Sequence, residues 1–509
     1  MSQILHIFKK DTHHLWPEIL ASLVVTSLFV KTYPHTWATG YQGSRVPNVV
    51  ASIVVVLVPV SWWVMLTRLI HQEALVGDSQ FWITRPYQWQ KLLAAKVLFL
   101  AAFLYVPFFI AQSMLLHEAG FHPLSYLSGL LFSLLLITLI LVVPIAAVAS
   151  VTSNFARAVL WLLATVVYIA GLAAVGGILF PSDEPTNYGG DAIFFVLCSL
   201  CIAAIILQYA TRNVRLSRWL LVAAAATAAI TVFPWPGSVL TNLEYPLSSA
   251  SRPRPVRLEL NSNSSPHTTP YGGDEKELLL QFPVTVSDVA VGTAVRVDAV
   301  KIAITAPNGL QWSSYWQSHV QYFTPVDSSS WADVKVNRAF LERVKDLPAQ
   351  VRITWAVSRI RAGATRQVVI DNEGFTIPNS SGICPLQDDD YSSYVECKFP
   401  MRQSRLTNFT AMWSRHPCSQ IQSHESLIPS SGWIGSLDSA PADFGITSVW
   451  TSSLYFQSKI FNPETPATRT FLCSGNPISF TEYTLVDKSQ VDLLIPEVKL
   501  PYRASDSMF

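Results

Sequence analysis

Cysteine is the residue type whose distribution in this sequence points most directly to chemistry. Cys198 and Cys201 lie in a long apolar run, where free cysteine usually acts as a small apolar side chain. The other four lie in the polar second half of the chain: Cys384, Cys397, Cys418 and Cys473. An even number of cysteines favours disulfides, and the absence of a CxxC or nearby HxxxH pair argues against zinc. Of the three possible pairings we expect Cys384–Cys397, which closes a short acidic loop, with Cys418–Cys473.

Two other groups of residues could hold a metal ion. His117 and His122 bracket the loop HEAGFHP with Glu118 between them, and Asp388–Asp390 form an acidic run. Loop histidines and acidic runs are most often solvated, so we predict no metal site. The sequence also contains no GxxxxGK[ST] phosphate-binding loop, no HExxH and no GxSxG. We therefore predict no catalytic residue and no cofactor on this chain.

The stretch HQEALVGDSQFWITRPYQWQKLLAAKVLF, residues 71–99, is amphipathic and too polar to cross a membrane. An acidic part is followed by an aromatic patch at Phe81 and Trp82, and then by Arg85-Pro86. Because proline disfavours helix at the residue before it and suits a first helical turn, a new helix is expected to begin there. The stretch fits a protrusion whose aromatic residues fill a pocket of a partner. It also fits an interfacial helix that only stabilises the bundle.

The pattern E-x(7)-F-W-x-T-R-P-x(4)-K-L-L-x-A-K, from Glu73 to Lys96, resembles the permease subunit of type-2 ABC transporters, the ABC-2 family, over about residues 1–236. The resemblance implies a permease homo- or heterodimer, a separate ABC ATPase subunit, and export as the usual direction. It implies that the loop between the second and third spans docks in a groove of the ATPase. By matching positions, Phe81 and Trp82 would be the buried plug and Arg85 a polar contact. The residues expected to carry this coupling are Glu73, Asp78, Phe81, Trp82, Arg85, Pro86 and Lys91.

A seventh span and a large C-terminal domain depart from the family pattern. The main rival is therefore a membrane-anchored extracytoplasmic binding or sensory protein without transport activity, which would need no aromatic protrusion. A membrane enzyme is a third possibility, but it lacks a catalytic constellation. The net charge of +1 gives no case for nucleic acid, which requires a concentrated basic face. The expected partners are an ATPase, a second permease subunit and membrane lipid.

Long apolar runs must position the 71–99 stretch. Hydrophobic residues make up 50% of the chain and charged residues 14%, against roughly 25% charged in soluble proteins. About 20 apolar residues cross a hydrocarbon layer about 30 Å thick. We predict seven spans, with six or eight as alternatives. They are Pro17–Tyr33, Val49–Ile70, Leu92–Leu116, Leu124–Val148, Ala158–Phe180, Ala192–Tyr209 and Trp219–Trp235.

Basic residues in short loops set the orientation, because Lys and Arg stay on the cytoplasmic side. With the N-terminus inside, the outer loops of the membrane domain carry only Lys31 and Arg45. The inner segments carry Lys9, Lys10, Arg68, Arg85, Lys91, Lys96, Arg157, Arg212, Arg215 and Arg218. We therefore expect a multi-pass protein of the inner (plasma) membrane, with a cytoplasmic N-terminus and an extracytoplasmic second half. No charge is expected deep inside a span, which argues against an ion-driven carrier.

The first residues predict an amphipathic helix lying on the inner leaflet, with an apolar side opposed by Lys9, Lys10 and Asp11. Lys91 and Lys96 are expected to anchor the start of the third span at the membrane surface. The expected domains are an interfacial helix (1–16), a transmembrane permease domain (17–236), a linker (237–256) and an extracytoplasmic β-rich domain (257–509).

The second half alternates apolar and polar residues in segments broken by turn residues, which predicts β-strands. The clearest segments are VRLELNS, ELLLQFPVTVSD, AVRVDAVKIAITAP, VRITWAVSRIRA and RQVVIDNEGFTIP. Such strands favour a sandwich or paired sheets, and Asn337–Ala349 is the one good helix candidate among them. The expected fold class is thus an α-helical polytopic membrane bundle followed by a mainly-β extracytoplasmic domain.

Overall fold

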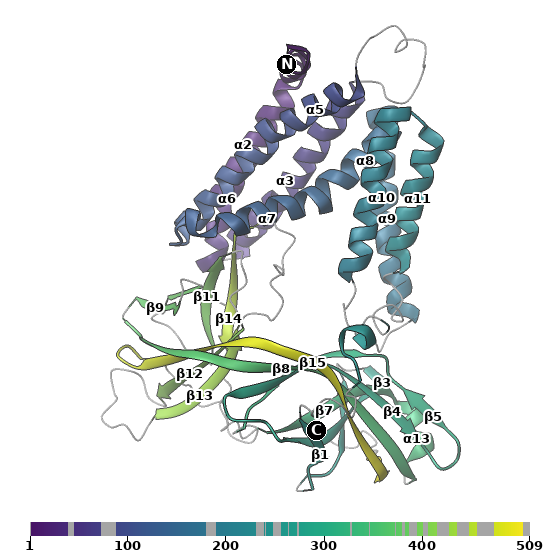
Figure 1. Cartoon of the computed structure of the whole chain (residues 1–509), viewed down its shortest axis with the longest axis vertical. Coiled ribbons are helices and arrows are strands. Elements are labelled where there is room, and N and C mark those ends of the chain that lie inside the picture. Colours follow the sequence, from purple (N-terminus) through teal and green to yellow (C-terminus); the bar gives the residue numbers. More distant parts are fainter. Residues whose placement is uncertain are drawn as a thin grey trace. The chain divides into compact units, whose positions relative to one another are not determined.

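The chain forms helices in its first half and mainly strands in its second (Figure 1). The computed structural model describes residues 2–38, 45–72, 88–179, 190–230, 239, 241–247, 256–262, 264–271, 274–325, 328–345, 347–371, 373–378, 382–385, 394–400, 406–414, 427–434, 447–455 and 473–501. Two compact units are built from non-contiguous parts of the chain. Unit 1 contains residues 1–165, 197–224 and 363–482, and unit 2 contains residues 166–196, 225–362 and 483–509.

The described residues of the first half form a series of helices. They are α1 (Ser2–His14), α2 (Trp16–Thr32), η1 (Tyr33–Ala38), α3 (Arg45–His71), α5 (Trp89–Leu100), η2 (Ala101–Tyr105), α6 (Val106–Glu118), η3 (Pro123–Tyr126), α7 (Leu127–Ile137), η4 (Thr138–Val142), α8 (Val143–Val151), α9 (Phe155–Leu179), α10 (Gly190–Thr211) and α11 (Val214–Ile230).

Several of these helices, joined end to end, reach membrane-spanning length. Five are long and apolar enough among the described residues: Val49–His71, Trp89–Glu118, Pro123–Val151, Phe155–Val175 and Phe194–Thr211. A sixth is obtained if Gln3–His14 and Trp16–Trp37, which are bent by 73°, count as one broken span. The seventh predicted span overlaps α11, which has 17 residues. Membrane-length apolar helices are therefore confirmed, while the count of seven stays a prediction.

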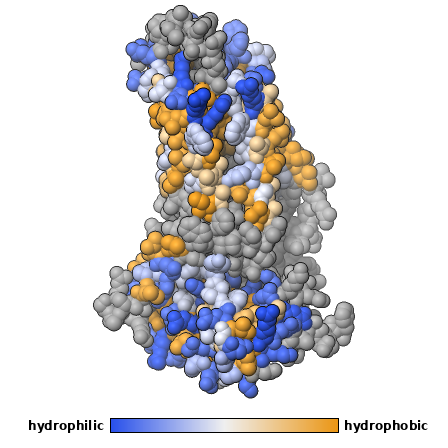
Figure 2. Space-filling view, turned by 90° about the vertical axis from the view of Figure 1, so that its right-hand side faces the viewer, coloured by the Kyte–Doolittle hydropathy of each residue, from blue (hydrophilic) through white to orange (hydrophobic). Residues whose placement is uncertain are grey.

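The outer surface of these helices is apolar. On the face drawn in Figure 2, hydrophobic residues cover much of the helical part, whereas the β-rich part is mostly hydrophilic. Large side chains such as Ile110 and Val167 are 52% and 69% exposed. Apolar surface of this extent is rare on soluble monomers and marks contact with lipid or protein.

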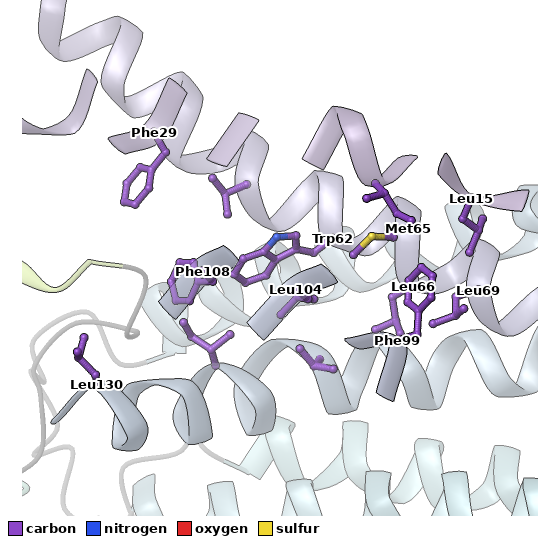
Figure 3. Close-up of a cluster of buried hydrophobic side chains, with 14 of the residues drawn as sticks. Leu15, Phe29, Trp62, Met65, Leu66, Leu69, Phe99, Leu104, Phe108 and Leu130 are labelled. Atoms are coloured by element: carbon purple, nitrogen blue, oxygen red, sulfur yellow. The ribbon is translucent and has the colours of Figure 1, made fainter. Parts of the chain in front are cut away.

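Aromatic side chains form the core of the helices in unit 1 (Figure 3). Trp62 of α3 meets Phe108 of α6 edge to face, with ring centroids 4.9 Å apart. Phe29 of α2 and Phe99 of α5 are fully buried in the same cluster. The periodic apolar faces of four helices thus converge on one core.

The strands of the second half form three sheets. They are β1 (Arg257–Leu260), β2 (His267–Tyr271), β3 (Asp274–Ser287), β4 (Thr293–Thr305), β5 (Gln311–Ser313), β6 (Gln317–Phe323), β7 (Ser329–Asn337), β8 (Pro348–Val369), β9 (Gly374–Ile377), β10 (Gly382–Pro385), β11 (Tyr394–Pro400), β12 (Thr407–Ser414), β13 (Leu427–Ile434), β14 (Val449–Tyr455) and β15 (Pro477–Lys499). The sheet orders are β1-β3-β2 with β7 on β3, β14-β11-β10-β9, and β13-β12-β15-β8-β4-β5 with β6 on β4.

In unit 2 the β3 and β7 strands pack against β4 and β8, as a sandwich. Their inward side chains share one buried cluster, which includes Phe282 of β3, Ile302 of β4 and Trp355 of β8. The predicted helix at Asn337–Ala349 is confirmed as α13 (Arg338–Val344), whose N-terminus is capped because the Asn337 side chain accepts a hydrogen bond from Ala339 N at 2.8 Å. The second half is therefore mainly β, as predicted, while its assignment as an extracytoplasmic domain of paired sheets stays a prediction.

Two predicted strand segments, VRITWAVSRIRA and the beginning of RQVVIDNEGFTIP, form the single strand β8. Gly363 lies within it, and a Cβ atom there would approach the carbonyl oxygen of Glu482 on β15 to 3.3 Å. Glycine at this position marks a close approach of two backbones rather than the turn that its presence in a sequence suggests.

The segment that follows α11 is docked on unit 2 where the structure describes it. Tyr245 is 1% exposed, and the Asn242 side chain accepts hydrogen bonds from Trp316 Nε1 at 3.2 Å and Gln490 Nε2 at 3.1 Å. Lys488 forms an ion pair with Glu244. Residues 241–247 of the predicted linker are thus held to the strands by side-chain and backbone contacts.

In unit 1, Cys384 of β10 is bonded to Cys397 of β11, which confirms the first predicted disulfide. We call the sheet β14-β11-β10-β9 the disulfide sheet. Cys473 is also disulfide-bonded, and its predicted partner Cys418 lies outside the described residues. Cys198 and Cys201 are free and buried, as expected of small apolar side chains.

Candidate coupling site

Most residues predicted to couple the chain to an ATPase lie outside the described part of the structure: Glu73, Asp78, Phe81, Trp82, Arg85 and Pro86. Lys91, the remaining one, is half-buried in α5. The structure does describe the frame of this segment, since α3 ends at His71 and α5 begins at Trp89. A partner bound to this segment would act on α3 and α5, so the contacts of these two helices show which other helices would move with them.

Helix α5 is joined to α1 by a buried ion pair about two turns after its first residue. Lys96 Nζ lies 2.8 Å from Asp11 Oδ2, and the two side chains are 4% and 0% exposed. Beside the pair, the rings of Phe8 and Phe103 stack with centroids 5.8 Å apart. A buried pair of this kind is costly to break, because either charge alone would be left uncompensated.

Three expectations from the sequence are corrected here. Asp11 does not belong to a polar face opposite the apolar one, because it is fully buried, and Ile7 one turn before it and Leu15 just after the end of α1 are buried too. The Lys96 side chain is buried against Asp11 and is not exposed as a surface anchor would be. A charge does lie inside an apolar helix of spanning length, about two turns into Trp89–Glu118, because Asp11 compensates it.

The spacing of Asp11 could have revealed the pair. Ile7, Asp11 and Leu15 recur every four residues, which places them on one helix stripe. A lone acid in an otherwise apolar stripe requires a basic partner. The sequence did not say that this partner would be Lys96.

The end of α3 is joined to α2 and α9. Arg68 forms an ion pair with Glu18 at the beginning of α2, and its guanidinium carbon lies 5.7 Å from the centroid of the Phe155 ring at the beginning of α9. The Arg68 side chain is 53% exposed, so the pair itself contributes little stability. The pair nevertheless shows that the end of α3 and the beginning of α2 are neighbours.

A third set of contacts completes this end of the helices. His71 Nε2 and Thr152 Oγ1 lie 2.9 Å apart, which joins α3 to the residue after α8. Arg218 of α11 donates from Nη2 to the Val151 carbonyl at 3.4 Å. These contacts connect the helix ends around the two ends of the 73–87 segment, either directly or through continuity of the chain. The helix ends concerned are the ends of α3 and α8 and the beginnings of α2, α5, α9 and α11.

The opposite end of the same helices carries the disulfide sheet. Ser448 Oγ donates to the Gln112 carbonyl of α6 at 2.8 Å, and the Tyr33 hydroxyl, just after α2, donates to the Val449 carbonyl at 3.4 Å. Lys398 of β11 lies 5.3 Å from the Trp37 ring centroid. Burial lowers the pKa of Lys398, and the charge of Glu118 opposes that shift.

The possible metal ligands of the sequence do not form a site where they are described. His117, Glu118 and His122 are exposed, and no group of three or more potential ligand side chains gathers within the described ranges. Asp388–Asp390 lie outside those ranges. The prediction of no metal site stays a prediction.

Comparisons with known proteins do not identify the chain. No protein-family model matches it, and no curated protein matches it. A solved structure titled "Phpd with cadmium complexed with hydroethylphosphonate (HEP)" shares 10% identity over 57% of this chain and 92% of its own, with a TM-score of 0.08. A likeness at that score carries no argument about fold or function.

Proposed function

We propose that this chain is the membrane permease subunit of an ABC transporter, coupled through residues 73–87 to a separate ATPase subunit. The protein would lie in the plasma membrane as a homo- or heterodimer and would export its substrate. The 73–87 segment would face the cytoplasm, and the disulfide-bonded sheet would lie outside.

One observation supports this proposal most directly. The 73–87 segment leaves and re-enters the helices at the end where Arg68 pairs with Glu18 and Lys96 pairs with Asp11. Ser448 and Val449, at the beginning of β14, contact residues toward the other end, namely Gln112 in the middle of α6 and Tyr33 just after α2. Helices that span a membrane would therefore put the aromatic segment, with the basic residues Arg68 and Lys91 on either side of it, and the disulfide on opposite sides. This is the arrangement that basic-residue topology and oxidising chemistry each require.

The frame of the segment also suits the transmission of force. A partner that pulls on residues 73–87 would act on α3 and α5 directly. Through the buried Asp11–Lys96 pair it would also act on α1, and through the bend of 73° it would act on α2. A rigid frame of this kind is what an ATPase needs in order to move membrane helices.

Co-purification of the full-length chain with its ATPase tests the proposal. Trp82→Ala is expected to weaken association by about 2 kcal/mol, or roughly thirtyfold in Kd, as truncation of a buried aromatic anchor does. Arg85→Glu should weaken it further by charge reversal. The measurements are the amount of Walker-motif ATPase that remains bound and the ATP hydrolysis rate of the purified complex.

Trp89→Ala provides the matched control, because Trp89 is a tryptophan of 37% exposure at the beginning of α5 and outside the docking residues. It should retain the ATPase. If Trp82→Ala and Arg85→Glu also retain full binding and hydrolysis, the coupling role is refuted. A chain that co-purifies with no ATPase at all, but binds a ligand through its outer domain, would establish the binding or sensory function instead.

A further inference from the structure

Two helices of unit 1 contain the same interruption. The helix Trp89–Glu118 changes from α to π geometry over η2, and the helix Pro123–Val151 does so over η4. The Val106 N–H bonds to the Ala101 carbonyl, and the Val143 N–H bonds to the Thr138 carbonyl, each five residues back. Single-turn π segments are rare and occur often at functional sites.

Proline explains why both interruptions arise where they do. Pro107 and Pro144 each stand two residues after the end of a π segment. Proline has no N–H, so it cannot donate to the carbonyl four residues before it, which is Phe103 or Ile140. The wider turn accommodates that missing bond, and helices kink at such points.

The two interruptions are in contact. Thr138 Oγ1, from η4, lies 2.8 Å from the hydroxyl of Tyr105, from η2, and 2.6 Å from the Leu134 carbonyl. A threonine hydroxyl has one proton and a carbonyl can only accept, so both bonds form when Tyr105 donates to Thr138. Leu104 and Val142 are buried beside them, at 1% and 4% exposure.

We infer that these two helices bend together at one shared hinge, formed by η2 and η4 and fastened by the Tyr105–Thr138 hydrogen bond. Each π segment lacks a full set of α-helical bonds, so it opens more easily than the helix on either side. The fastening makes opening of one segment favour opening of the other. A displacement of α5 at the end that holds Lys96 is thereby converted into a change of direction in both α6 and α7.

This hinge is a property of the chain itself and does not require an ATPase. The proposed function can therefore fail while the hinge stands, and the reverse also holds. Within the proposed function, the hinge would be the point at which movement at the coupling site opens a path between helices.

Double electron–electron resonance, which measures the distance between two spin labels, tests the bending in the full-length chain in lipid nanodiscs. Spin labels at Gln90 and Met114, both exposed, flank η2 on one continuous helix and lie about 36 Å apart if it is straight. Cys198 and Cys201 are replaced by serine to remove other labelling sites. We expect a broad or two-peaked distance distribution that narrows in Pro107→Ala, where the α-helical bond can form.

The decisive variant is Pro144→Ala, which lies on the other helix. A shared hinge predicts that it also narrows the Gln90–Met114 distribution. A narrow distribution in the parent chain, or a distribution that Pro144→Ala leaves unchanged, would overturn the inference.

Hydrogen exchange provides a second measurement, on variants that loosen the hinge rather than stiffen it. Tyr105→Phe should raise the exchange of the Val106 and Val143 amides alike, by about fivefold for one lost hydrogen bond. Thr138→Val should do the same, and the double variant should add nothing further. Tyr168→Phe is the control, because that hydroxyl donates to the Ala225 carbonyl at 2.7 Å and so joins α9 to α11 instead. Exchange that rises only in the mutated segment would refute the fastening.

Discussion

Replacing Lys96 with methionine removes one member of the buried pair that holds α1 against α5. The two charges lie 2.8 Å apart, so they attract by about 6 kcal/mol at an effective dielectric constant of about 20. Part of this attraction offsets the cost of taking both charges out of water. Measured losses on removing one partner of a buried pair are about 3–5 kcal/mol. At 1.4 kcal/mol per tenfold change, the undocked population of α1 should rise roughly a hundredfold to several thousandfold.

Cysteine reactivity can follow that population. Ile7 lies on the buried stripe of α1 at 5% exposure, so an Ile7→Cys side chain reacts with maleimide only when α1 undocks. The free cysteines Cys198 and Cys201 are first replaced by serine, and this variant with Ile7→Cys is the parent protein of the experiment. The alkylation rate of the full-length protein in detergent is then compared with and without Lys96→Met.

Two further variants make the test specific. Asp11→Leu combined with Lys96→Met replaces the pair by apolar side chains and should recover most of the loss, because no unpaired charge remains. Lys9→Met removes an exposed lysine of the same helix and should change the rate little. A Lys96→Met rate within about threefold of the parent, or a double variant no better than the single one, would refute the argument.

Three other predictions concern topology, the disulfide and pH. A reporter active only outside the cytoplasm should work when fused after Ser238 and be silent after Arg215, and the reverse pattern would place the β-rich half inside. A disulfide that closes a loop across 13 residues is expected to stabilise the fold by about 3 kcal/mol, so reducing agent should lower the Tm of the full chain. The variant with serine at both Cys384 and Cys397 should show a smaller fall in Tm on reduction. An equal fall in both proteins would assign the effect to the disulfide of Cys473. Burial lowers the pKa of His319, but the hydrogen bond and charge of Asp333 prevail, so the pKa is raised. The pair therefore contributes stability below the unfolded-state value near 6.5, and that contribution is lost as pH rises through the raised pKa; Asp333→Asn should remove this part of the Tm slope, and an unchanged slope would contradict it.

The sequence predicted those parts of the fold that depend on local patterns. Apolar runs located the helices, alternation located β1, β3 and β4, and Asn337 marked the start of α13. Cys384 and Cys397 paired as their short separation suggested. These features depend on residues that are close in sequence, so they can be recognised in one amino-acid sequence alone.

The features that were missed depend on partners far apart in sequence. Asp11 and Lys96 are separated by 85 positions, and each had a satisfactory explanation alone, as a solvated acid and as an interfacial lysine. The π segment at Ala101–Tyr105 was missed because an apolar run gives no sign of its hydrogen-bond pattern. The coupling segment itself rests on its sequence pattern, since six of its seven named residues lie outside the described structure.

The way unit 1 is assembled from three separate stretches has a consequence for biogenesis. Helix α1 leaves the ribosome before its partner Lys96, which follows Asp11 by 85 residues, so α1 can dock on α5 only after that stretch has been synthesised. Ser448 reaches Gln112 across 336 positions. The contact with α6 can therefore form only after residue 448 has been synthesised. Closing loops of this length is slow relative to local folding, so these two contacts are expected to form after the helices themselves.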